Sequence, residues 1–102
     1  MARSKRSKAC DISDKVRKEV RQRDKDACIF CGRYGSQIAH FIGRSQGGLG
    51  IPQNLVLACV SCHYAMDQTD KREEYKNKAR KYLKSKYSGW KEEELYYRKW
   101  GI

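Results

Sequence analysis

Two cysteine pairs of equal spacing constrain this chain more than any other feature of its sequence. Cys28 and Cys31 form one Cys-x-x-Cys knuckle, and Cys59 and Cys62 form a second. Four thiolates in two such knuckles can close a tetrahedral zinc site, which would join the two ends of the segment between them. We therefore expect a structural zinc ion bound by these four residues, and we expect the remaining cysteine, Cys10, to be a free thiol.

Length and charge narrow the class of protein. The chain has 102 residues, of which 39% are hydrophobic. This predicts one small domain whose core is too small to be stable without a bound structural metal ion. The formal net charge of +11 favours a polyanionic partner. No stretch predicts a membrane span or a secretory signal after Met1, so we expect a soluble, cytoplasmic protein without a membrane partner. In a reducing compartment, cysteines favour metal binding over disulfides.

The distribution of charge predicts how the chain is divided. Residues 1–12 are rich in basic residues, which predicts a disordered arm. Residues 13–102 are expected to form a single α+β domain. Within it we expect a core finger over residues 28–68 and C-terminal helices over residues 70–102.

Local patterns predict the individual elements. Ser13 is a suitable N-cap for a helix to about Asp24, and apolar residues within 37–42 and 55–58 predict two short strands. Further helices are expected after Cys62, from a capping box at Asp70 to Glu73 as far as about Lys86, and from about Trp90 to Trp100. The last helix would leave Leu95 outside an aromatic stripe, which belongs either in the core or against nucleic-acid bases: Trp90, Tyr96, Tyr97 and Trp100.

Residue types suited to phosphodiester chemistry lie between and just after the knuckles. Hydrolysis needs a base that activates water and positive charge near the phosphate. His40 titrates near neutral pH and suits the base. His63 and Asp67, four residues apart on an expected helix, can bind a hard divalent ion. Two other interpretations stay open, in which His40 is a hydrogen-bonded core histidine or His63 is a zinc ligand in a Cys₃His site.

The same residues resemble the HNH nuclease family, also called the ββα-metal finger. The resemblance covers about residues 28–67 and rests on the two knuckles and on three short segments: Ala39-His40-Phe41-Ile42, Asn54-Leu55 and Cys62-His63. It implies a zinc-stapled ββα finger in which His40 is the general base and His63 binds the catalytic metal. Asn54 would bridge to the loop that carries the base and hold His40 in place. The resemblance also implies a structural zinc remote from the chemistry, a 5′-phosphate and a 3′-hydroxyl as product ends, and a phage or mobile element as the source.

One position departs from the family pattern. Members commonly carry an aspartate or histidine ligand directly before the base, where this chain has Ala39. Asp67 occupies the i+4 position from His63, where some members, such as the colicin nucleases, carry a second ligand. We expect His63 and Asp67 to share a magnesium or manganese ion, with waters and the scissile phosphate completing its coordination.

These observations favour a metal-dependent HNH endonuclease that nicks DNA. Arg44, Lys78 and Lys81 are expected to contact DNA phosphates, although basic helix faces are often only solvated. A double-strand break would require a homodimer or successive events. The competing interpretation is a non-catalytic zinc-finger DNA-binding accessory of phage recombination or packaging machinery, and a third is an RNA-associated zinc protein. A phage-encoded protein would act in the host cytoplasm.

Overall fold

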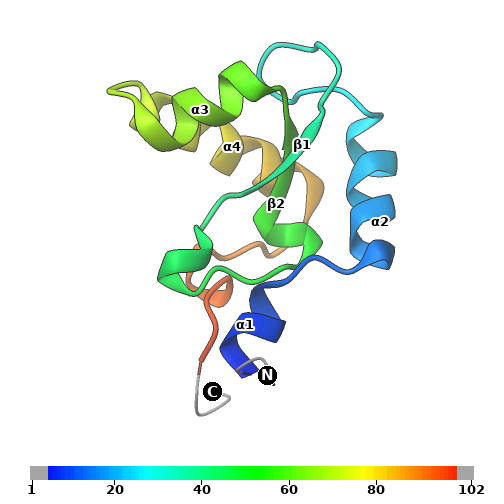
Figure 1. Ribbon diagram of the computed structural model, residues 1–102, viewed down its shortest axis with the longest axis vertical. Coiled ribbons are helices and arrows are strands. Elements are labelled where there is room, and N and C mark those ends of the chain that lie inside the picture. The colour runs from blue at the N-terminus through cyan, green and yellow to red at the C-terminus, as the bar shows by residue number, and fades with distance from the viewer. Residues whose placement is uncertain (1–4, 99–102) are drawn as a thin grey trace.

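A two-stranded antiparallel sheet lies at the centre of the protein, with helices packed against both of its faces (Figure 1). The computed structural model describes residues 5–98. The two strands of the sheet pair with Ile38 opposite Leu57 and His40 opposite Leu55. The elements in chain order are α1 (Lys5–Cys10), α2 (Asp14–Asp24), β1 (Gln37–His40), β2 (Leu55–Ala58), α3 (Val60–Gln68) and α4 (Arg72–Lys86), with 3₁₀ turns at Arg44–Gln46, Pro52–Asn54 and Glu92–Glu94.

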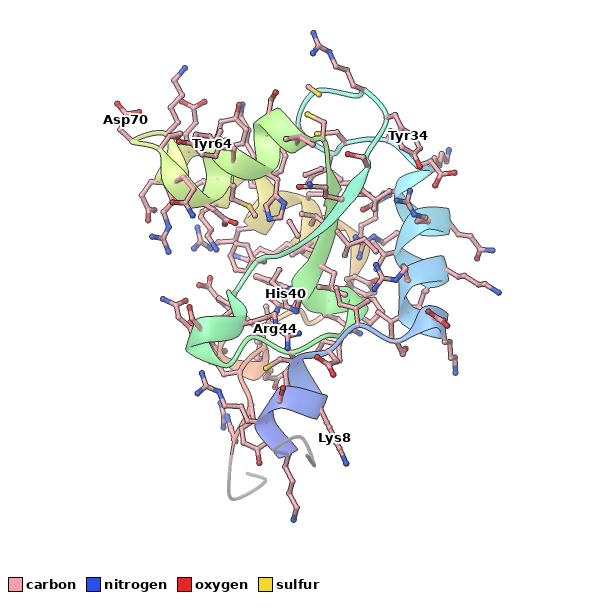
Figure 2. The ribbon with its side chains drawn as sticks, viewed as in Figure 1. Lys8, Tyr34, His40, Arg44, Tyr64 and Asp70 are labelled. Atoms are coloured by element: carbon pink, nitrogen blue, oxygen red, sulfur yellow. The ribbon has the colours of Figure 1, made fainter. Side chains whose placement is uncertain are left out.

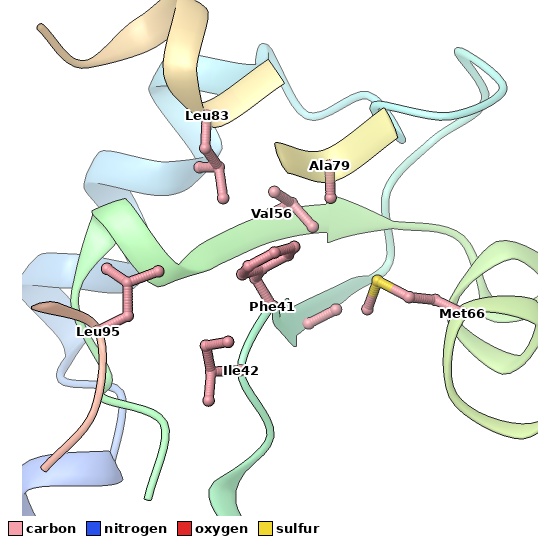
Figure 3. Packing of buried hydrophobic residues seen from close by; sticks show 8 residues of the cluster. Phe41, Ile42, Val56, Met66, Ala79, Leu83 and Leu95 are labelled. Atoms are coloured by element: carbon pink, nitrogen blue, oxygen red, sulfur yellow. The ribbon is translucent and has the colours of Figure 1, made fainter. Parts of the chain in front are cut away.

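The core lies on both faces of strand β2. Successive residues of a strand point to opposite faces, so Leu55 and Leu57 pack with Val20 of α2 while Val56 faces the other way. The larger cluster fills the space between the sheet, α3, α4 and the C-terminal segment (Figure 3). Its members are Ala39, Phe41, Ile42, Val56, Met66, Ala79, Leu83 and Leu95. This packing explains why every residue of the short strand β2 is buried.

The α+β class predicted from the sequence is confirmed. Two antiparallel strands are followed directly by α3, which gives the ββα order, and helices flank this unit on both sides. The side chain of Ser13 caps α2 as predicted, because its Oγ accepts a hydrogen bond from the Val16 N–H at 3.2 Å. No helix in the described part of the chain is long and apolar enough to cross a membrane.

A buried ion pair joins α2 to β2 and α4. The Asp24 carboxylate accepts hydrogen bonds from Arg23 Nε at 2.7 Å, from the Leu57 N–H at 3.0 Å and from the Tyr82 hydroxyl. Burial and the bond to Asp24 raise the pKa of Tyr82 to about 12, so this phenol stays protonated and remains a donor. Three elements that are distant in sequence are therefore fixed to one carboxylate.

The beginning of α4 and the C-terminal segment differ from the prediction. Lys71 occupies the N-cap position of α4 without a side-chain cap, so the predicted capping box at Asp70 to Glu73 is wrong. The helix expected over residues 90–100 is also wrong over its described part, where a 3₁₀ turn at Glu92–Glu94 is the helical element.

Backbone pairing explains the difference at the C-terminal end. The Leu95 carbonyl accepts from the Leu49 N–H at 2.9 Å, and the Tyr97 N–H donates to the Gly47 carbonyl at 2.7 Å. These long-range bonds replace the bonds within a helix. Leu95, expected outside the apolar stripe, is 2% exposed and belongs to the core. Trp90 and Tyr96 pack against the same cluster, whereas Trp100 lies outside the described residues.

The N-terminal arm also differs from its prediction over residues 5–12. Helix α1 occupies Lys5–Cys10 and ends with the Cys10 side chain buried. The Gly50 N–H donates to the Ala9 carbonyl at 3.0 Å, and Arg6 Nη2 donates to the Ser45 carbonyl at 2.8 Å. A basic segment with few apolar residues is therefore held here by polar contacts to a distant loop.

Candidate active site and metal centre

The four knuckle cysteines converge on one point. Their sulfur atoms all lie within 4.8 Å of one another, and the Cys31 and Cys59 sulfurs are 3.7 Å apart. Tetrahedral zinc with Zn–S bonds of about 2.3 Å places neighbouring sulfurs about 3.8 Å apart. The cluster can therefore hold a metal ion, and its donors and spacing fit zinc. Among the described residues this group contains only cysteines, so His63 is not part of it.

Local backbone geometry builds both knuckles. In the first, the Gly32 N–H donates to the Cys28 carbonyl at 2.9 Å, and Gly32 has a φ of +81°, which favours glycine. In the second, Cys59 occupies the N-cap position of α3, so Cys62 lies in the first helical turn. Cys28 and Cys62 are buried, and Cys31 is exposed.

The thiol pKa values reflect this crowding. A backbone hydrogen bond involving Cys62 is the main cause that lowers the pKa of the Cys59 thiol to about 7. Burial, together with hydrogen bonds to the neighbouring thiols, raises the pKa of Cys62 to about 12. Cys59 thus loses its proton readily, whereas deprotonation of Cys62 is unfavourable. A bound divalent cation would make deprotonation of all four cysteines favourable, because its charge compensates the repulsion among the thiolates.

His63 and Asp67 lie one turn apart on α3 and face each other as predicted. His63 Nε2 is 3.1 Å from Asp67 Oδ2. Two neighbouring ligands at about 2.1 Å from one octahedral ion would be about 3.0 Å apart, so this spacing fits a shared magnesium or manganese ion. Ala39 is fully buried beside Val56 and Met66 in the core and supplies no ligand atom.

Gln37 fixes the ring of His63 and was not anticipated from the sequence. Its Oε1 lies 2.6 Å from His63 Nδ1. Because an amide oxygen only accepts, Nδ1 donates to Gln37, and Nε2 is the nitrogen that faces Asp67, where a bound metal ion would take both as ligands. Gln37 and Ala39 share one face of β1, and that alternation was the available signal for a side chain directed toward α3.

His40 ends strand β1, and its ring is held by the N-terminal segment. Its Nε2 lies 2.9 Å from the Cys10 carbonyl oxygen. This acceptor requires the proton on Nε2, so the neutral ring has an unprotonated Nδ1. Burial is the main cause that lowers the pKa of His40. The charges of Arg44 and His63 lower it further, while the Cys10 bond and Asp11 oppose the shift.

Asn54 is fully buried and organises the loop that follows His40. Its Oδ1 accepts from the Ile42 N–H at 2.7 Å, while Nδ2 donates to the carbonyls of Ile42 at 3.1 Å and Leu49 at 2.8 Å. Gly48 makes this closure possible, because a Cβ there would lie 1.7 Å from the Ile42 oxygen. The amide thus joins the two ends of the loop, as the proposed bridging role requires.

The predicted DNA-contacting residues lie in different settings. Arg44 lies close to His40 between β1 and α1 (Figure 2), and its guanidinium donates to the Cys10 carbonyl at 2.8 Å. It also pairs with Asp11 at 2.8 Å. Lys78 and Lys81 are exposed on α4, and Lys78 lies 3.7 Å from Glu74. The structure brings Arg44 to the candidate base, whereas the two lysines lie on α4.

Lys76 is a second residue that the sequence did not single out. It is half-buried and donates to the carbonyl of Phe41, the residue after the candidate base. Burial is the main cause that lowers its pKa. Lys76, Arg72 and Arg80 line a cavity of 230 Å³, and the acidic residues Glu73 and Glu92 also line it. The sequence context of Lys76, a lysine-rich helix, carried no signal that distinguished it from its neighbours.

Comparison with known proteins agrees with this geometry. Residues 28–67 match the family model described as HNH endonuclease. This part of the chain is therefore similar to HNH endonucleases, and we refer to residues 28–67 as the HNH segment. A protein of Lactococcus phage SK1 described as "Probable HNH endonuclease" is 39% identical over 57 residues, a region that covers 47% of this chain and 61% of that relative. The similarity therefore spans less than two thirds of the relative's length, and the HNH resemblance seen in the sequence is confirmed.

Proposed function

We propose that the HNH segment makes this protein a metal-dependent endonuclease that hydrolyses DNA phosphodiester bonds. The observation that carries the proposal is that the two histidines present different ring nitrogens for different tasks. His40 has Nδ1 available to accept a proton, and His63 has Nε2 directed at the Asp67 carboxylate. A base and a two-residue metal ligand set are what such hydrolysis requires from side chains.

Each residue has a definite task in this proposal. His40 takes the proton from the attacking water through Nδ1, and Asn54 keeps the loop after His40 closed. His63 and Asp67 hold magnesium or manganese. When bound, that ion supplies positive charge to the phosphate and the leaving oxygen. Cleavage by this family chemistry leaves a 5′-phosphate and a 3′-hydroxyl.

The surroundings of the site support DNA as the substrate. The net charge of +11 favours a polyanion, and Arg44, Lys78 and Lys81 are our candidates for phosphate contacts. One His40 and one ion make one centre, so a single chain nicks one strand, and a homodimer or successive events would cut both. We place the protein in the cytoplasm of a phage-infected host, beside packaging or recombination machinery.

The test is the nicking of supercoiled plasmid by the zinc-loaded protein. Wild type and His40→Ala are incubated with added magnesium, with added manganese, or with neither after desalting, and circular dichroism confirms that the fold is retained. We expect wild-type nicking only with the added ion. We expect at least about a 100-fold loss in His40→Ala with unchanged DNA binding, because general base catalysis contributes about this much.

The outcomes separate the competing functions. A DNA mobility shift without nicking under any metal condition would contradict the enzyme and support a non-catalytic DNA-binding accessory. Tighter binding to RNA than to DNA across several salt concentrations would support the RNA-associated protein. Nicking at the wild-type rate by His40→Ala would remove His40 as the base.

A further inference from the structure

The N-terminal segment 6–11 is attached to the loop that carries Arg44. Arg6 donates to the Ser45 carbonyl at 2.8 Å, and the Ala9 carbonyl accepts from the Gly50 N–H at 3.0 Å. The Cys10 side chain is 2% exposed, which is unusual for a segment this polar. The contacts reach across more than thirty positions of sequence, so they belong to the tertiary fold and not to a local turn.

A single carbonyl in this segment binds both functional side chains nearby. The Cys10 oxygen accepts from His40 Nε2 at 2.9 Å and from Arg44 Nη1 at 2.8 Å. The next residue, Asp11, pairs with the other terminal nitrogen of Arg44 at 2.8 Å. The position of this one peptide therefore decides where the imidazole and the guanidinium point.

Close packing against Gly50 fixes where that peptide lies. A Cβ on Gly50 would be 1.9 Å from the Asp11 carbonyl oxygen and 2.9 Å from the Cys10 carbonyl oxygen. Both atoms belong to the backbone and cannot move aside independently. Any side chain at position 50 must therefore displace the N-terminal segment or the loop.

We propose that residues 6–11 are a positioning element of the catalytic site, holding His40 through the Cys10 carbonyl and Arg44 through that carbonyl and Asp11. This inference rests on the proposed nuclease function. The segment makes no chemical step. Its contribution is to keep the His40 ring in one tautomer and one orientation, and to hold the Arg44 guanidinium beside that ring.

The physical consequence follows from what a free imidazole does. Without the Cys10 acceptor, the neutral ring distributes its proton between Nδ1 and Nε2 and rotates about its side-chain torsions. Only part of the population then presents an unprotonated Nδ1 to water. Misplacement of a reacting group by about 1 Å can lower a rate about 100-fold, so we expect a loss of about 10- to 100-fold when the segment is displaced.

Two glycines of the same loop provide a matched pair of variants. Gly50→Ala places its new methyl group against the Asp11 and Cys10 carbonyls. Gly43→Ala is the control, because the nearest atom to its Cβ is Ser45 Oγ at 3.8 Å and its φ of −63° suits alanine. Each variant is compared with wild type for the nicking rate at saturating DNA and manganese. The ¹⁵N chemical shifts of the His40 ring report its tautomer.

We expect Gly50→Ala to nick about 10- to 100-fold more slowly than wild type and to give ring shifts of mixed tautomers, while Gly43→Ala matches wild type in both. A wild-type rate and an Nε2-protonated ring in folded Gly50→Ala would overturn the inference. Where Gly50→Ala does not fold, Asp11→Asn takes its place. It removes the charge that pairs with Arg44 with little change of shape, and an unaltered nicking rate contradicts the positioning of Arg44 by this segment.

These readouts also separate this inference from the proposed function. Absence of nicking by wild type with either metal ion would contradict the nuclease proposal. The tautomer measurement would still decide whether segment 6–11 holds the His40 ring. Nicking by wild type that Gly50→Ala matches, with an unchanged ring, would leave the nuclease proposal intact and overturn the positioning role alone.

Discussion

The two histidines of this chain bind different hydrogen-bond acceptors through different ring nitrogens. His40 donates through Nε2 to the Cys10 carbonyl, and His63 donates through Nδ1 to the Gln37 side chain. The remaining nitrogen is Nδ1 in His40, whereas in His63 it is Nε2, which lies 3.1 Å from Asp67 Oδ2. In the proposed mechanism these two histidines would supply a proton acceptor and a ligand atom, and their different partners account for the difference.

The environment of His40 predicts the pH dependence of cleavage. Burial and the charges of Arg44 and His63 lower the pKa of His40 below its ordinary value of 6.5. A base must be neutral to accept a proton, so the rate should fall to half of its plateau value only below pH 6.5. Single-turnover nicking rates measured from about pH 5 to 8 at saturating manganese test this. A rate that already falls as the pH drops through about 7.5 would contradict it.

The same pKa shift has a consequence for stability. The folded ring binds a proton less readily than the unfolded chain does. His40 therefore reduces the free energy of unfolding as the pH drops below about 6.5, and it has no such effect well above that pH. The difference in the free energy of unfolding between wild type and His40→Ala, from urea titrations, should therefore be constant well above pH 6.5 and change on the acidic side. A difference that stays the same at acidic pH would reflect only the lost packing and the lost bond to Cys10.

If the proposed nuclease function holds, Asp67 should decide the magnesium concentration that nicking requires. Its carboxylate lies 3.1 Å from His63 Nε2, whereas Asp70 lies at the exposed turn after α3, away from His40 (Figure 2). Loss of one of two protein ligands should raise the magnesium concentration for half-maximal nicking at least about ten-fold in Asp67→Ala. Asp70→Ala removes the same charge nearby and should leave the titration unchanged. Superimposable titrations for both variants would exclude Asp67 from the site.

At the scale of elements, the Arg23–Asp24 pair connects α2 with β2 and α4. The Asp24 side chain has 0% exposure, whereas Asp26 in the exposed Arg21–Asp26 pair has 61%. Asp24→Asn should lower the free energy of unfolding by about 3 to 5 kcal/mol, because it leaves a buried cation without its charge partner. Asp26→Asn, the matched surface change, should cost at most about 1 kcal/mol. Equal urea midpoints for the two variants would show that Asp24 does not join these elements.

Elements specified by nearby residues were predictable from the sequence, and those held by distant backbone were not. The N-cap at Ser13 and the apolar run of β2 carry their signal locally, and both were placed correctly. Helix α1 and the C-terminal segment depend on bonds to the loop near Gly47 and Gly50. No window of sequence contains those partners, so a disordered arm and a last helix were predicted there instead.

The candidate site divides in the same way. The residue types and spacing of the knuckles, His40, Asn54 and His63 identified the groups, because each belongs to a motif of fixed order. The residues that orient them, Gln37 and Cys10, act through a side chain on the neighbouring strand and through a backbone carbonyl. A carbonyl carries no residue-type signal, so only the tertiary structure could reveal the contact.

At the scale of the whole molecule, the stability of this small domain should depend on zinc. The first knuckle, the end of β2 and α3 meet around the cysteine cluster, where Ala58 packs with Cys28 and Cys62 and Tyr75 of α4 packs against them. Structural zinc sites contribute about 10 to 16 kcal/mol of apparent binding free energy, against a total stability of about 5 to 15 kcal/mol for a typical domain. Loss of the ion should therefore unfold the finger and not merely loosen it.

A pair of cysteine variants tests this dependence. Cys59→Ser should lose the bound zinc and most of the ordered helix signal, because Cys59 belongs to the cluster and begins α3. Cys10→Ala removes a cysteine outside the cluster and should retain one zinc ion per chain. Native mass spectrometry counts the ion, and circular dichroism before and after chelation follows the fold. A zinc-free chain with an unchanged spectrum would contradict the structural role, and zinc loss in Cys10→Ala would reassign the ligand set.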